Sequence, residues 1–422
     1  MGLYEEFEWR GMVQDATQGL RELLSCGKVA AYVGFDPTAD SLHVGSLLPL
    51  TVLTRLQRFG HHVVAVVGGG TGMIGDPSGK SDERNLLNEE QIAANARGIQ
   101  AQIARFLDFD RADNPGRMVN NLEWLGAFRM VDFLRDVGKN FTVNYMIAKE
   151  SVKRRLGSEQ GISYTEFSYL ILQAYDFLAL HDRHGVILQV GGSDQWGNIT
   201  AGIDLIRSQR AKKAHGLVHP LVTSATGVKF GKTEEGTVWL DPKRTSPYRF
   251  YQFWMNTADS DVIQYLKFFS FLEEPEIQAL EQAHLQAPHQ RAAHRRLAEE
   301  VTRMVHGEEA LGRAQRATEI FFGAELDDLD LGETLELFAD VPSTSMSRDE
   351  FGSGVSIVDM LVATGVAKGR KDARRSIEGG GIYVNNRRVE DADARFSPEQ
   401  AIGSELFVLR KGKKAYHLLR IE

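Results

Sequence analysis

The chain reads Tyr32-Val33-Gly34-Phe35-Asp36-Pro37-Thr38-Ala39-Asp40-Ser41-Leu42-His43-Val44-Gly45-Ser46, passing from an apolar run through a polar turn into a helical pattern. Pro49 is tolerated only near the start of a helix, so we expect this helix to begin near Gly45. Thr38 and His43 would then lie beside the helix N-terminus, where free N–H groups and the helix dipole favour a phosphate group. The alternative is that His43 only caps the helix.

The same order of apolar run, glycine and helix recurs over the first 240 residues. Runs suited to buried parallel strands lie at 29–33, 63–67 and 186–190, and they end at Gly34, Gly68-Gly69-Gly70 and Gly191-Gly192. Amphipathic helical stretches lie between them, such as 47–59 and 89–107. This order predicts an α/β fold with a Rossmann-like doubly wound parallel sheet over residues 1–245. The site is expected at the carboxyl ends of the strands.

The remaining sequence divides into three parts. From about Tyr248 the pattern becomes helical, which predicts an α-helical domain at 246–322. Acidic residues crowd the segment 323–354, which predicts an exposed linker, although 335–338 is apolar enough for a short docked strand. Residues 355–422 read as a small α+β domain, with helices at 357–364 and 368–377, a strand at 382–384 and a turn at Asn385-Asn386.

The composition limits the class of protein. The chain has 422 residues, of which 42% are hydrophobic and 25% charged, as in ordinary globular proteins. No apolar run reaches the 18 residues or so that a membrane span needs, so no membrane partner is expected. A single cysteine, Cys26, excludes an internal disulfide and a cysteine-based metal site. Because the start is acidic and lacks the order of a signal peptide, we expect a cytoplasmic protein.

The net charge of −8 hides an uneven distribution. Residues 365–422 carry 13 lysines and arginines against 8 acidic residues, a balance of +5, so the rest of the chain carries −13. Lys371, Arg374 and Arg375 fall within one turn of a predicted helix and form a basic patch. This pattern favours a nucleic-acid partner for the last domain, and the alternative is a solvated surface.

Two nucleotide-binding motifs in the sequence are misleading. Gly70-Thr71-Gly72-Met73-Ile74-Gly75 has the GxGxxG spacing, but Asp76-Pro77-Ser78-Gly79 follows where a dinucleotide site needs a helix. The stretch 75–81 resembles a phosphate-binding P-loop but is one residue short, because Ile74 stands where glycine is required. We therefore disfavour a dehydrogenase and reject a P-loop.

Two further segments carry candidate binding groups. Lys229-Phe230-Gly231-Lys232-Thr233 places two lysines three residues apart in a loop, which suits a triphosphate clamp, and the alternative is a solvated loop. Ser163-x-x-Glu166 is a capping-box pattern that starts a helix. On this helix Tyr169, Gln173 and Asp176 share one face, an unusual polar stripe among apolar neighbours.

These segments together resemble a known family. Asp36-Pro37-Thr38 with His43-Val44-Gly45-Ser46, followed by 229–233, is similar to the paired signatures of class I aminoacyl-tRNA synthetases. The stretches 72–80, 163–169 and 191–198 resemble the bacterial tyrosyl-tRNA synthetase family in particular, and the basic end is similar to an S4-type RNA-binding domain. Two departures stand out. In the first signature, Ser46 replaces the second histidine. In the second signature, Lys-Met-Ser-Lys-Ser, Phe230-Gly231 stands in place of Met-Ser and Thr233 in place of the final Ser.

The resemblance implies a two-step reaction that uses L-tyrosine, ATP with Mg²⁺, and tRNA(Tyr), with no tightly bound cofactor and no metal held by protein ligands. It assigns the substrate ammonium group to Asp76, Tyr169 and Gln173, the phenol hydroxyl to Tyr32 and Asp176, and the reacting carboxylate to Gln195. It assigns ATP to Gly34, Asp36, His43, Gly45, Gly192, Asp194 and Lys232. Catalytic contacts to the pyrophosphate end are implied for Thr38, His43, Lys80, Arg84, Lys229, Lys232 and Thr233.

The resemblance also implies partners for the other domains. The helical domain would meet the anticodon, and Lys371, Arg374 and Arg375 would bind tRNA. A homodimer is implied, with its interface in an insertion at about 120–165. A non-catalytic RNA-binding protein on the same fold is the remaining alternative, and the presence of His43, Asp176, Lys229 and Lys232 argues against it.

Overall fold

A computed structural model describes most of the chain. It covers residues 2–78, 87–157, 161–223, 230–233, 236–326, 329–338, 341–352, 354–412 and 415–422, with only the backbone of Lys232, Thr233 and Glu336. The chain forms two compact units, Met1–Glu308 and Glu309–Glu422, which are described separately below.

A six-stranded sheet forms the centre of the first unit. Its order is β1 (Asp15–Ala16), β6 (His215–His219), β5 (Val186–Gly192), β2 (Ala30–Phe35), β3 (His62–Val67) and β4 (Arg117–Asn120). All neighbours are parallel except β1, which is antiparallel to β6. The three predicted strands correspond to β2, β3 and β5, and the doubly wound parallel fold is confirmed. The strand order reverses between β2 and β5, where such sheets bind ligands.

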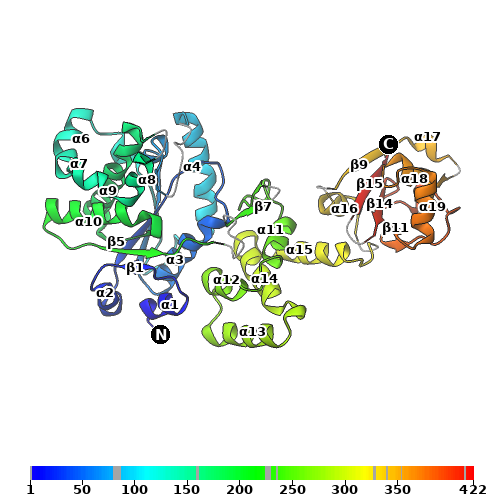
Figure 1. Ribbon diagram of the computed structural model, residues 1–422, viewed down its shortest axis with the longest axis horizontal. Helices are drawn as coiled ribbons and strands as arrows, with labels where there is room; N and C mark the ends of the chain where they lie inside the picture. The colour runs from blue at the N-terminus through cyan, green and yellow to red at the C-terminus, as the bar shows by residue number, and fades with distance from the viewer. Residues whose placement is uncertain are drawn as a thin grey trace. The chain divides into compact units, whose positions relative to one another are not determined.

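Helices cover both faces of this sheet (Figure 1). Alternate residues of β2 and β3, including Tyr32 and Val64, join one apolar cluster with α9 (Tyr164–His184) and α10 (Trp196–Arg210). The helix α3 (Leu47–Arg58) contacts the same two strands but contributes nothing to that cluster, so it lies on the other face. The remaining helices before β4 are α1 (Leu3–Trp9), α2 (Leu20–Cys26) and α4 (Glu89–Ile103).

Short helices fill the segment between β4 and α9. They are α5 (Leu122–Leu125), α6 (Met130–Asp136), α7 (Val143–Ile147) and α8 (Glu150–Leu156). Several large apolar side chains here are exposed, among them Met130 (75%), Val131 (73%) and Val143 (60%). Such a concentration of exposed apolar groups is characteristic of a surface that another protein covers.

The helical segment that follows the sheet has an aromatic core. It contains α11 (Pro247–Met255), α12 (Val262–Phe269), α13 (Glu274–Gln286) and α14 (Ala292–His306), all in the first unit. Trp254 is fully buried, and its ring lies 5.1 Å from the centre of Phe269. The next helix, α15 (Glu308–Phe321), falls almost wholly in the second unit. The predicted helical domain at 246–322 is therefore divided between the two units.

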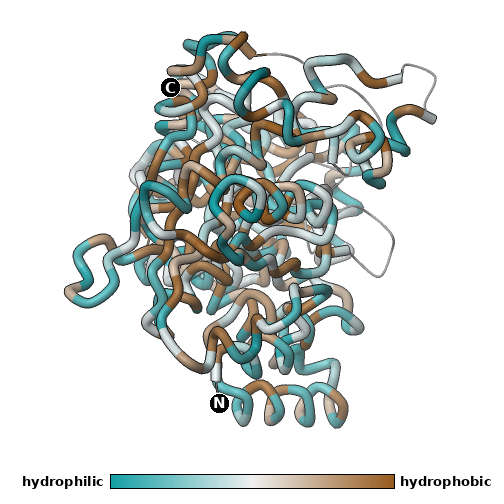
Figure 2. The backbone as a smooth tube through the Cα atoms, turned by 90° about the vertical axis from the view of Figure 1, so that its left-hand side faces the viewer, coloured by the Kyte–Doolittle hydropathy of each residue, from teal (hydrophilic) through white to brown (hydrophobic). Residues whose placement is uncertain are grey.

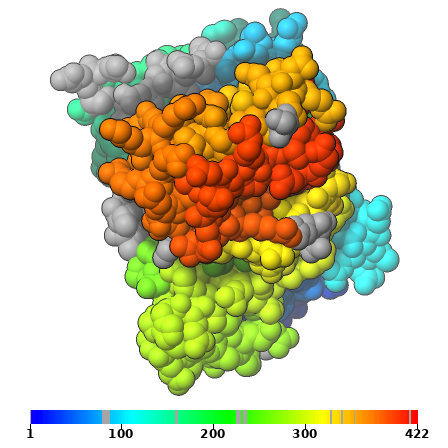
Figure 3. Space-filling view, turned by 90° about the vertical axis from the view of Figure 1, so that its right-hand side faces the viewer, coloured from blue at the N-terminus to red at the C-terminus, as the bar shows by residue number. Residues whose placement is uncertain are grey.

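The second unit is an α+β domain built on a five-stranded sheet. The order is β12 (Arg387–Arg388), β11 (Ile382–Val384), β14 (Leu406–Lys411), β15 (Ala415–Ile421) and β9 (Ser343–Met346). Helices α18 (Ile357–Ala363) and α19 (Arg370–Glu378) pack on it, and β10 (Val355–Ser356) pairs with β13 (Arg395–Phe396). Figure 3 shows the orange and red segments of residues 355–422 as one compact surface. Asn385 and Asn386 both have positive φ, as a two-residue hairpin turn requires.

The structure differs from the predicted acidic linker. Within 323–354, α16 (Leu331–Leu337) takes the place of the suggested strand, and α17 (Arg348–Phe351) follows β9. β9 pairs in parallel with β15, and Phe338 is fully buried in a cluster with Ile320 and Leu418. Acidic composition indicated exposure, but the apolar residues spaced between the charges anchor this segment to the sheet.

The helices are amphipathic, and Figure 2 shows hydrophobic (brown) and hydrophilic (teal) residues alternating along the tube. Within the described ranges, no helix is long and apolar enough to cross a membrane.

Candidate functional site

The carboxyl end of β2 carries the first group of the site, Asp36. Its two carboxylate oxygens accept hydrogen bonds from the hydroxyls of Thr71 (2.7 Å), in the turn that follows β3, and of Tyr169 (2.8 Å) on α9. Gly68 makes this approach possible, because a Cβ there would lie 2.0 Å from Asp36 Oδ1. Burial, together with Asp36 and Asp76, raises the pKa of Tyr169 well above its usual value, so its hydroxyl stays protonated.

A row of amide side chains connects Asp76 with α9 and with the residues that follow β5. Gln195 donates from Nε2 to Asp76 Oδ2 (2.7 Å) and accepts at Oε1 from Gln173 (3.2 Å). Asn198 donates to Gln173 Oε1 (2.9 Å). Gln195 also contacts Asp194 (3.3 Å). The predicted residues from three separate segments therefore form one connected network.

The polar stripe on α9 ends at a buried carboxylate. Asp176 is 4% exposed, and it accepts hydrogen bonds from Asn121 Nδ2 (2.9 Å) and Trp124 Nε1 (2.7 Å). Burial raises the pKa of Asp176 to about 7, which outweighs the lowering effect of these two donors. A carboxylate is held here close to its ionisation point.

The hydroxyl of Tyr32 lies buried beside this carboxylate. Tyr32 is 2% exposed, and its hydroxyl has no hydrogen-bond partner among the described residues. Its pKa is raised well above the usual value by burial and then by the charge of Asp176. Because an unsatisfied buried hydroxyl costs about 1–3 kcal/mol, this group is suited to a polar ligand that supplies a partner.

The start of α9 is confirmed, but its cap differs from the predicted one. Ser163 accepts a hydrogen bond from the Glu166 backbone, so the helix begins at Tyr164. The Glu166 side chain does not complete a capping box. It forms a buried bidentate ion pair with Arg155 of α8, with contacts of 3.0 and 2.8 Å. A buried arginine elsewhere in the sequence competes better for this carboxylate than the backbone N–H does.

His43 precedes the helix as predicted and also caps it. Its Nδ1 accepts from the Gly45 backbone (3.0 Å), so the neutral ring carries its proton on Nε2, and the side chain is exposed. One 3₁₀ turn, η1 (Val44–Ser46), comes before α3. The expectation that His43 caps this turn is confirmed, and its contact with a nucleotide stays a prediction. Thr38 and Gly34 are also exposed, at the same end of β2.

The segment after residue 229 docks beside this turn. The Val44 N–H donates to Val238 O (3.1 Å), and Trp239 pairs with His43 through an isolated β-bridge. Gly231 has a φ of +79°, and a Cβ there would lie 2.6 Å from Val44. The next two residues form β7 (Lys232–Thr233), which pairs with β8 (Gly236–Thr237). The backbone at Gly231, Val238 and Trp239 therefore packs against the turn that carries His43.

Phe230 anchors this loop in the aromatic core. Its ring stacks on Phe269 at 5.6 Å with an angle of 5°, and it packs edge-on against Tyr265 at 5.2 Å. Three predicted residues, Lys80, Arg84 and Lys229, lie outside the described part of the chain, as do the side chains of Lys232 and Thr233.

The GxGxxG stretch does not open a helix in the described residues. A 3₁₀ turn, η2 (Thr71–Met73), is followed by loop as far as Ser78. The turn is held by Asn121, which accepts from Gly70 N (2.7 Å). A Cβ at Gly70 would lie 2.9 Å from the Leu125 side chain, and one at Gly72 would lie 3.0 Å from Pro37, so both glycines serve close packing. The P-loop-like stretch lies partly outside the described residues.

The basic patch of the second unit is exposed but already paired. Arg374 contacts Asp393 (2.8 Å), and Arg375 contacts Asp372 (3.2 Å). Lys371 is exposed on the same helix. Exposed ion pairs of this kind contribute only about 0–1 kcal/mol, so an anion can displace them.

Sequence reasoning missed four polar residues of the site, which are Thr71, Asn121, Trp124 and Asn198. Asn121 directly follows β4, a strand that the pattern did not predict because its start is polar. Asn198 lies one helical turn after Gln195, a spacing that could have identified it.

Comparison with known families gives two matches. Residues 24–323 match the tRNA synthetases class I (W and Y), and residues 333–419 match the tyrosine–tRNA ligase SYY-like C-terminal domain. The first match alone spans well over half of the chain.

Individual proteins agree with these matches. The chain is 55% identical over 420 residues to a tyrosine–tRNA ligase of Roseiflexus castenholzii, covering 99% of both chains. It is 52% identical over 423 residues to one of Bacillus caldotenax, covering 100% of both. A C-terminally truncated mitochondrial tyrosyl-tRNA synthetase of Aspergillus nidulans matches in structure, with a TM-score of 0.69 and 29% identity over 76% of this chain and 94% of that one.

Proposed function

The chain belongs to the class I tRNA synthetases of the tryptophan and tyrosine group, and from this premise we propose which residues bind each part of the substrates of a tyrosine–tRNA ligase. The enzyme joins L-tyrosine to ATP, giving tyrosyl-adenylate and pyrophosphate, and transfers tyrosine to the 3′ end of tRNA(Tyr). The observation that carries the assignment is the buried Asp176 carboxylate beside the unpartnered Tyr32 hydroxyl, at the end of a polar row that leads to the strand ends.

Asp176 and Tyr32 receive the phenol hydroxyl of the substrate. The phenol donates to the carboxylate and accepts from Tyr32, which supplies the buried Tyr32 hydroxyl with its missing partner. Phenylalanine supplies neither contact, so it leaves both groups unsatisfied. At the other end of the substrate, Asp76, Tyr169 and Gln173 hold the ammonium group, and Gln195 lies next to them to orient the carboxylate.

The nucleotide is placed across the strand-order reversal between β2 and β5. Gly34, Asp36, Gly192 and Asp194 line the adenosine side, with Gly45 at the helix start. The substrate carboxylate is already a nucleophile, so the first step needs no protein base. Its oxygen attacks the α-phosphate and pyrophosphate leaves, and catalysis comes from positioning and charge stabilisation. The groups proposed to meet the pyrophosphate are Thr38, His43, Lys80, Arg84, Lys229, Lys232 and Thr233, and Mg²⁺ enters with ATP.

The second unit is proposed to bind tRNA through phosphates. Lys371, Arg374 and Arg375 present an exposed basic face whose ion pairs are weak enough to be replaced. Replacing all three with alanine should weaken tRNA binding. It should also reduce the slope of the logarithm of the binding constant against the logarithm of the salt concentration by up to about 3, because each phosphate contact contributes about 0.9 to that slope. ATP–pyrophosphate exchange should be unchanged, and an unchanged tRNA affinity would remove the assignment.

A homodimer is proposed through the segment between β4 and α9. The exposed Met130, Val131 and Val143 supply an apolar surface suited to a second copy. Val131→Asp should shift the protein to monomers in sedimentation velocity, whereas Leu285→Asp, at an exposed apolar position on α13, should not. We place the enzyme in the cytoplasm, together with tRNA and ATP.

The reaction is tested by ATP–pyrophosphate exchange with each amino acid in turn. We expect exchange with tyrosine and almost none with phenylalanine. Exchange with no amino acid would support a non-catalytic RNA-binding protein, and exchange with another amino acid would overturn the substrate assignment.

A further inference from the structure

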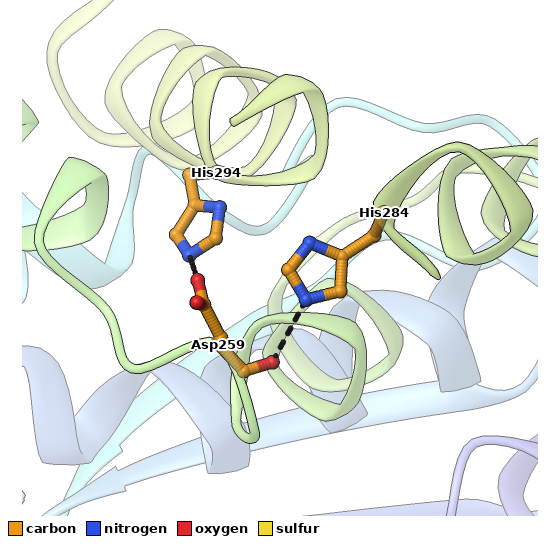
Figure 4. A group of neighbouring side chains, drawn as sticks. All are labelled: Asp259, His284 and His294. Carbon is orange, nitrogen blue, oxygen red and sulfur yellow. Dashed lines mark hydrogen bonds and ion pairs between the residues drawn. The ribbon is translucent and has the colours of Figure 1, made fainter. Parts of the chain in front are cut away.

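A cluster far from the catalytic residues in sequence brings together Asp259, His284 and His294 (Figure 4). Asp259 lies in the loop between α11 and α12, His284 on α13 and His294 on α14. One potential ligand atom from each residue lies within 4.8 Å of the others. No metal-binding spacing is visible in the sequence, because the three residues come from separate elements.

Hydrogen bonding fixes the tautomer of His284. Its Nε2 lies 3.2 Å from the backbone oxygen of Asp259, which can only accept, so Nε2 carries the proton. The other ring nitrogen, Nδ1, is buried, has no hydrogen-bond partner among the described residues, and lies toward His294 (Figure 4). Histidine ligands of metals commonly donate their second N–H to a carbonyl in this way.

His294 is the second histidine of the cluster, and its ring points toward Asp259. Its side chain is fully buried, and burial, followed by the charge of Arg291, lowers its pKa. His294 Nε2 lies 3.1 Å from Asp259 Oδ1, close to the separation of about 3.4 Å between two ligands of a tetrahedral zinc ion. Asp259 is 61% exposed, so one side of the cluster is open to solvent.

We propose that Asp259, His284 and His294 form a binding site for a zinc-like divalent cation that joins the α11–α12 loop to α13 and α14. Two imidazole nitrogens and one carboxylate favour zinc or cobalt over magnesium. Solvent on the exposed side supplies the fourth ligand. Side-chain rotations bring the three ligand atoms from their present separations to a common ion.

The positive charge of Arg291 lies close to Asp259 and should repel a cation bound there, which provides a test of the site. Its Nη1 lies 3.8 Å from Asp259 Oδ1, outside hydrogen-bond range, while Nη2 donates to the Met255 carbonyl. The guanidinium can therefore stay on Met255 when Asp259 turns to a cation. Removing its charge with Arg291→Gln should tighten cation binding several-fold, which is the opposite of the effect of removing a ligand.

The experiment uses the untagged full-length chain, stripped with a chelator and titrated with Zn²⁺ by calorimetry. We expect one equivalent per chain, with affinity reduced at least about 100-fold in Asp259→Asn and in His284→Ala. His289→Ala is the matched control, an exposed histidine between α13 and α14, and should bind as the unmodified chain does. Co²⁺ should give the visible absorption of a four-coordinate site, and circular dichroism should show that each variant is folded.

Several results would overturn the proposal. These are no zinc equivalent in the unmodified chain, equal binding in His284→Ala, or an equal loss in His289→Ala. Zinc should also raise the melting temperature of the unmodified chain, but not that of folded Asp259→Asn. An equal rise in both would show that the cation binds elsewhere.

Discussion

The two ends of the proposed catalytic site, the tyrosine end and the nucleotide end, are built differently. At the tyrosine end, Asp176, Asn121 and Trp124 are buried and connected by hydrogen bonds of 2.7–2.9 Å, and Asp176 lies on α9, which packs against β5. At the nucleotide end, Thr38, Gly34 and the side chain of His43 are exposed, and the backbone of 231–233 reaches the turn from a separate hairpin. Recognition of a small rigid phenol needs fixed partners, whereas a triphosphate has to enter and its pyrophosphate has to leave.

The buried ion pair between Arg155 and Glu166, which supports α9 at the tyrosine end, gives the largest expected effect. Arg155→Ala should destabilise the first unit by about 3–5 kcal/mol, because it leaves the Glu166 carboxylate buried without its ion pair. Urea unfolding measures this loss. Arg210→Ala removes an exposed ion pair with Asp182 of the same α9 helix and should cost less than about 1 kcal/mol. Equal losses of unfolding free energy in Arg155→Ala and Arg210→Ala would contradict the importance of the buried ion pair.

A change at the nucleotide end should affect catalysis without affecting tyrosine binding. Lys232→Ala should slow ATP–pyrophosphate exchange by about 100- to 1000-fold, through loss of a charge that stabilises the transition state. The dissociation constant of tyrosine, measured by equilibrium dialysis, should stay unchanged. Lys243→Ala, an exposed lysine in a later loop, is the control. A weaker affinity for tyrosine would show that the two ends are not separate.

A change at the tyrosine end should instead affect the specificity for the amino acid. Asp176→Asn should reduce the discrimination of tyrosine against phenylalanine by about 10- to 100-fold, because the neutral amide no longer accepts equally well from the phenol, Asn121 and Trp124. Pyrophosphate exchange with each amino acid measures the ratio. Asp182→Asn, on the exposed part of α9, should leave it unchanged. Full discrimination in folded Asp176→Asn would remove this residue from the phenol site.

The smallest expected effect is a pH dependence at the tyrosine end alone. With the pKa of Asp176 at about 7, the carboxylate fraction rises from about one tenth at pH 6 to about nine tenths at pH 8, so tyrosine affinity should rise about tenfold. A raised carboxyl pKa also means that Asp176 costs folding stability as pH rises from about 4 to 7. Asp176→Asn should abolish the affinity slope, and a flat profile in the unmodified enzyme would contradict the ionisation.

The sequence predicts the nucleotide end better than the tyrosine end. The apolar runs at 29–33, 63–67 and 186–190 end in glycine, so the ends of these strands and the positions of Asp36 and His43 follow from local pattern. Asn121 and Trp124 could not be found in this way, because they follow a short strand with polar residues and reach Asp176 only through the packing of the sheet. The α9 stripe was visible because a helix repeats its face within a few residues.

The second unit shows the same limit. The acidic composition of 323–354 indicated an exposed linker in spite of the apolar residues at 335–338, and the pairing of β9 with β15 joins segments about seventy residues apart. No local pattern carries that information, whereas the turn at Asn385-Asn386 was predicted from its two residues alone.

The pairing of β9 with β15 also sets an order of events during translation. Residues 343–346 leave the ribosome long before 415–421, so β9 waits without its only sheet neighbour in the described chain until β15 has been made. The helices α11–α14 lie in the first unit, Met1–Glu308, all of which is made before β15. Domains generally fold as units from the N-terminal side during synthesis, so the first unit should complete its fold on the ribosome, while the second closes its sheet last.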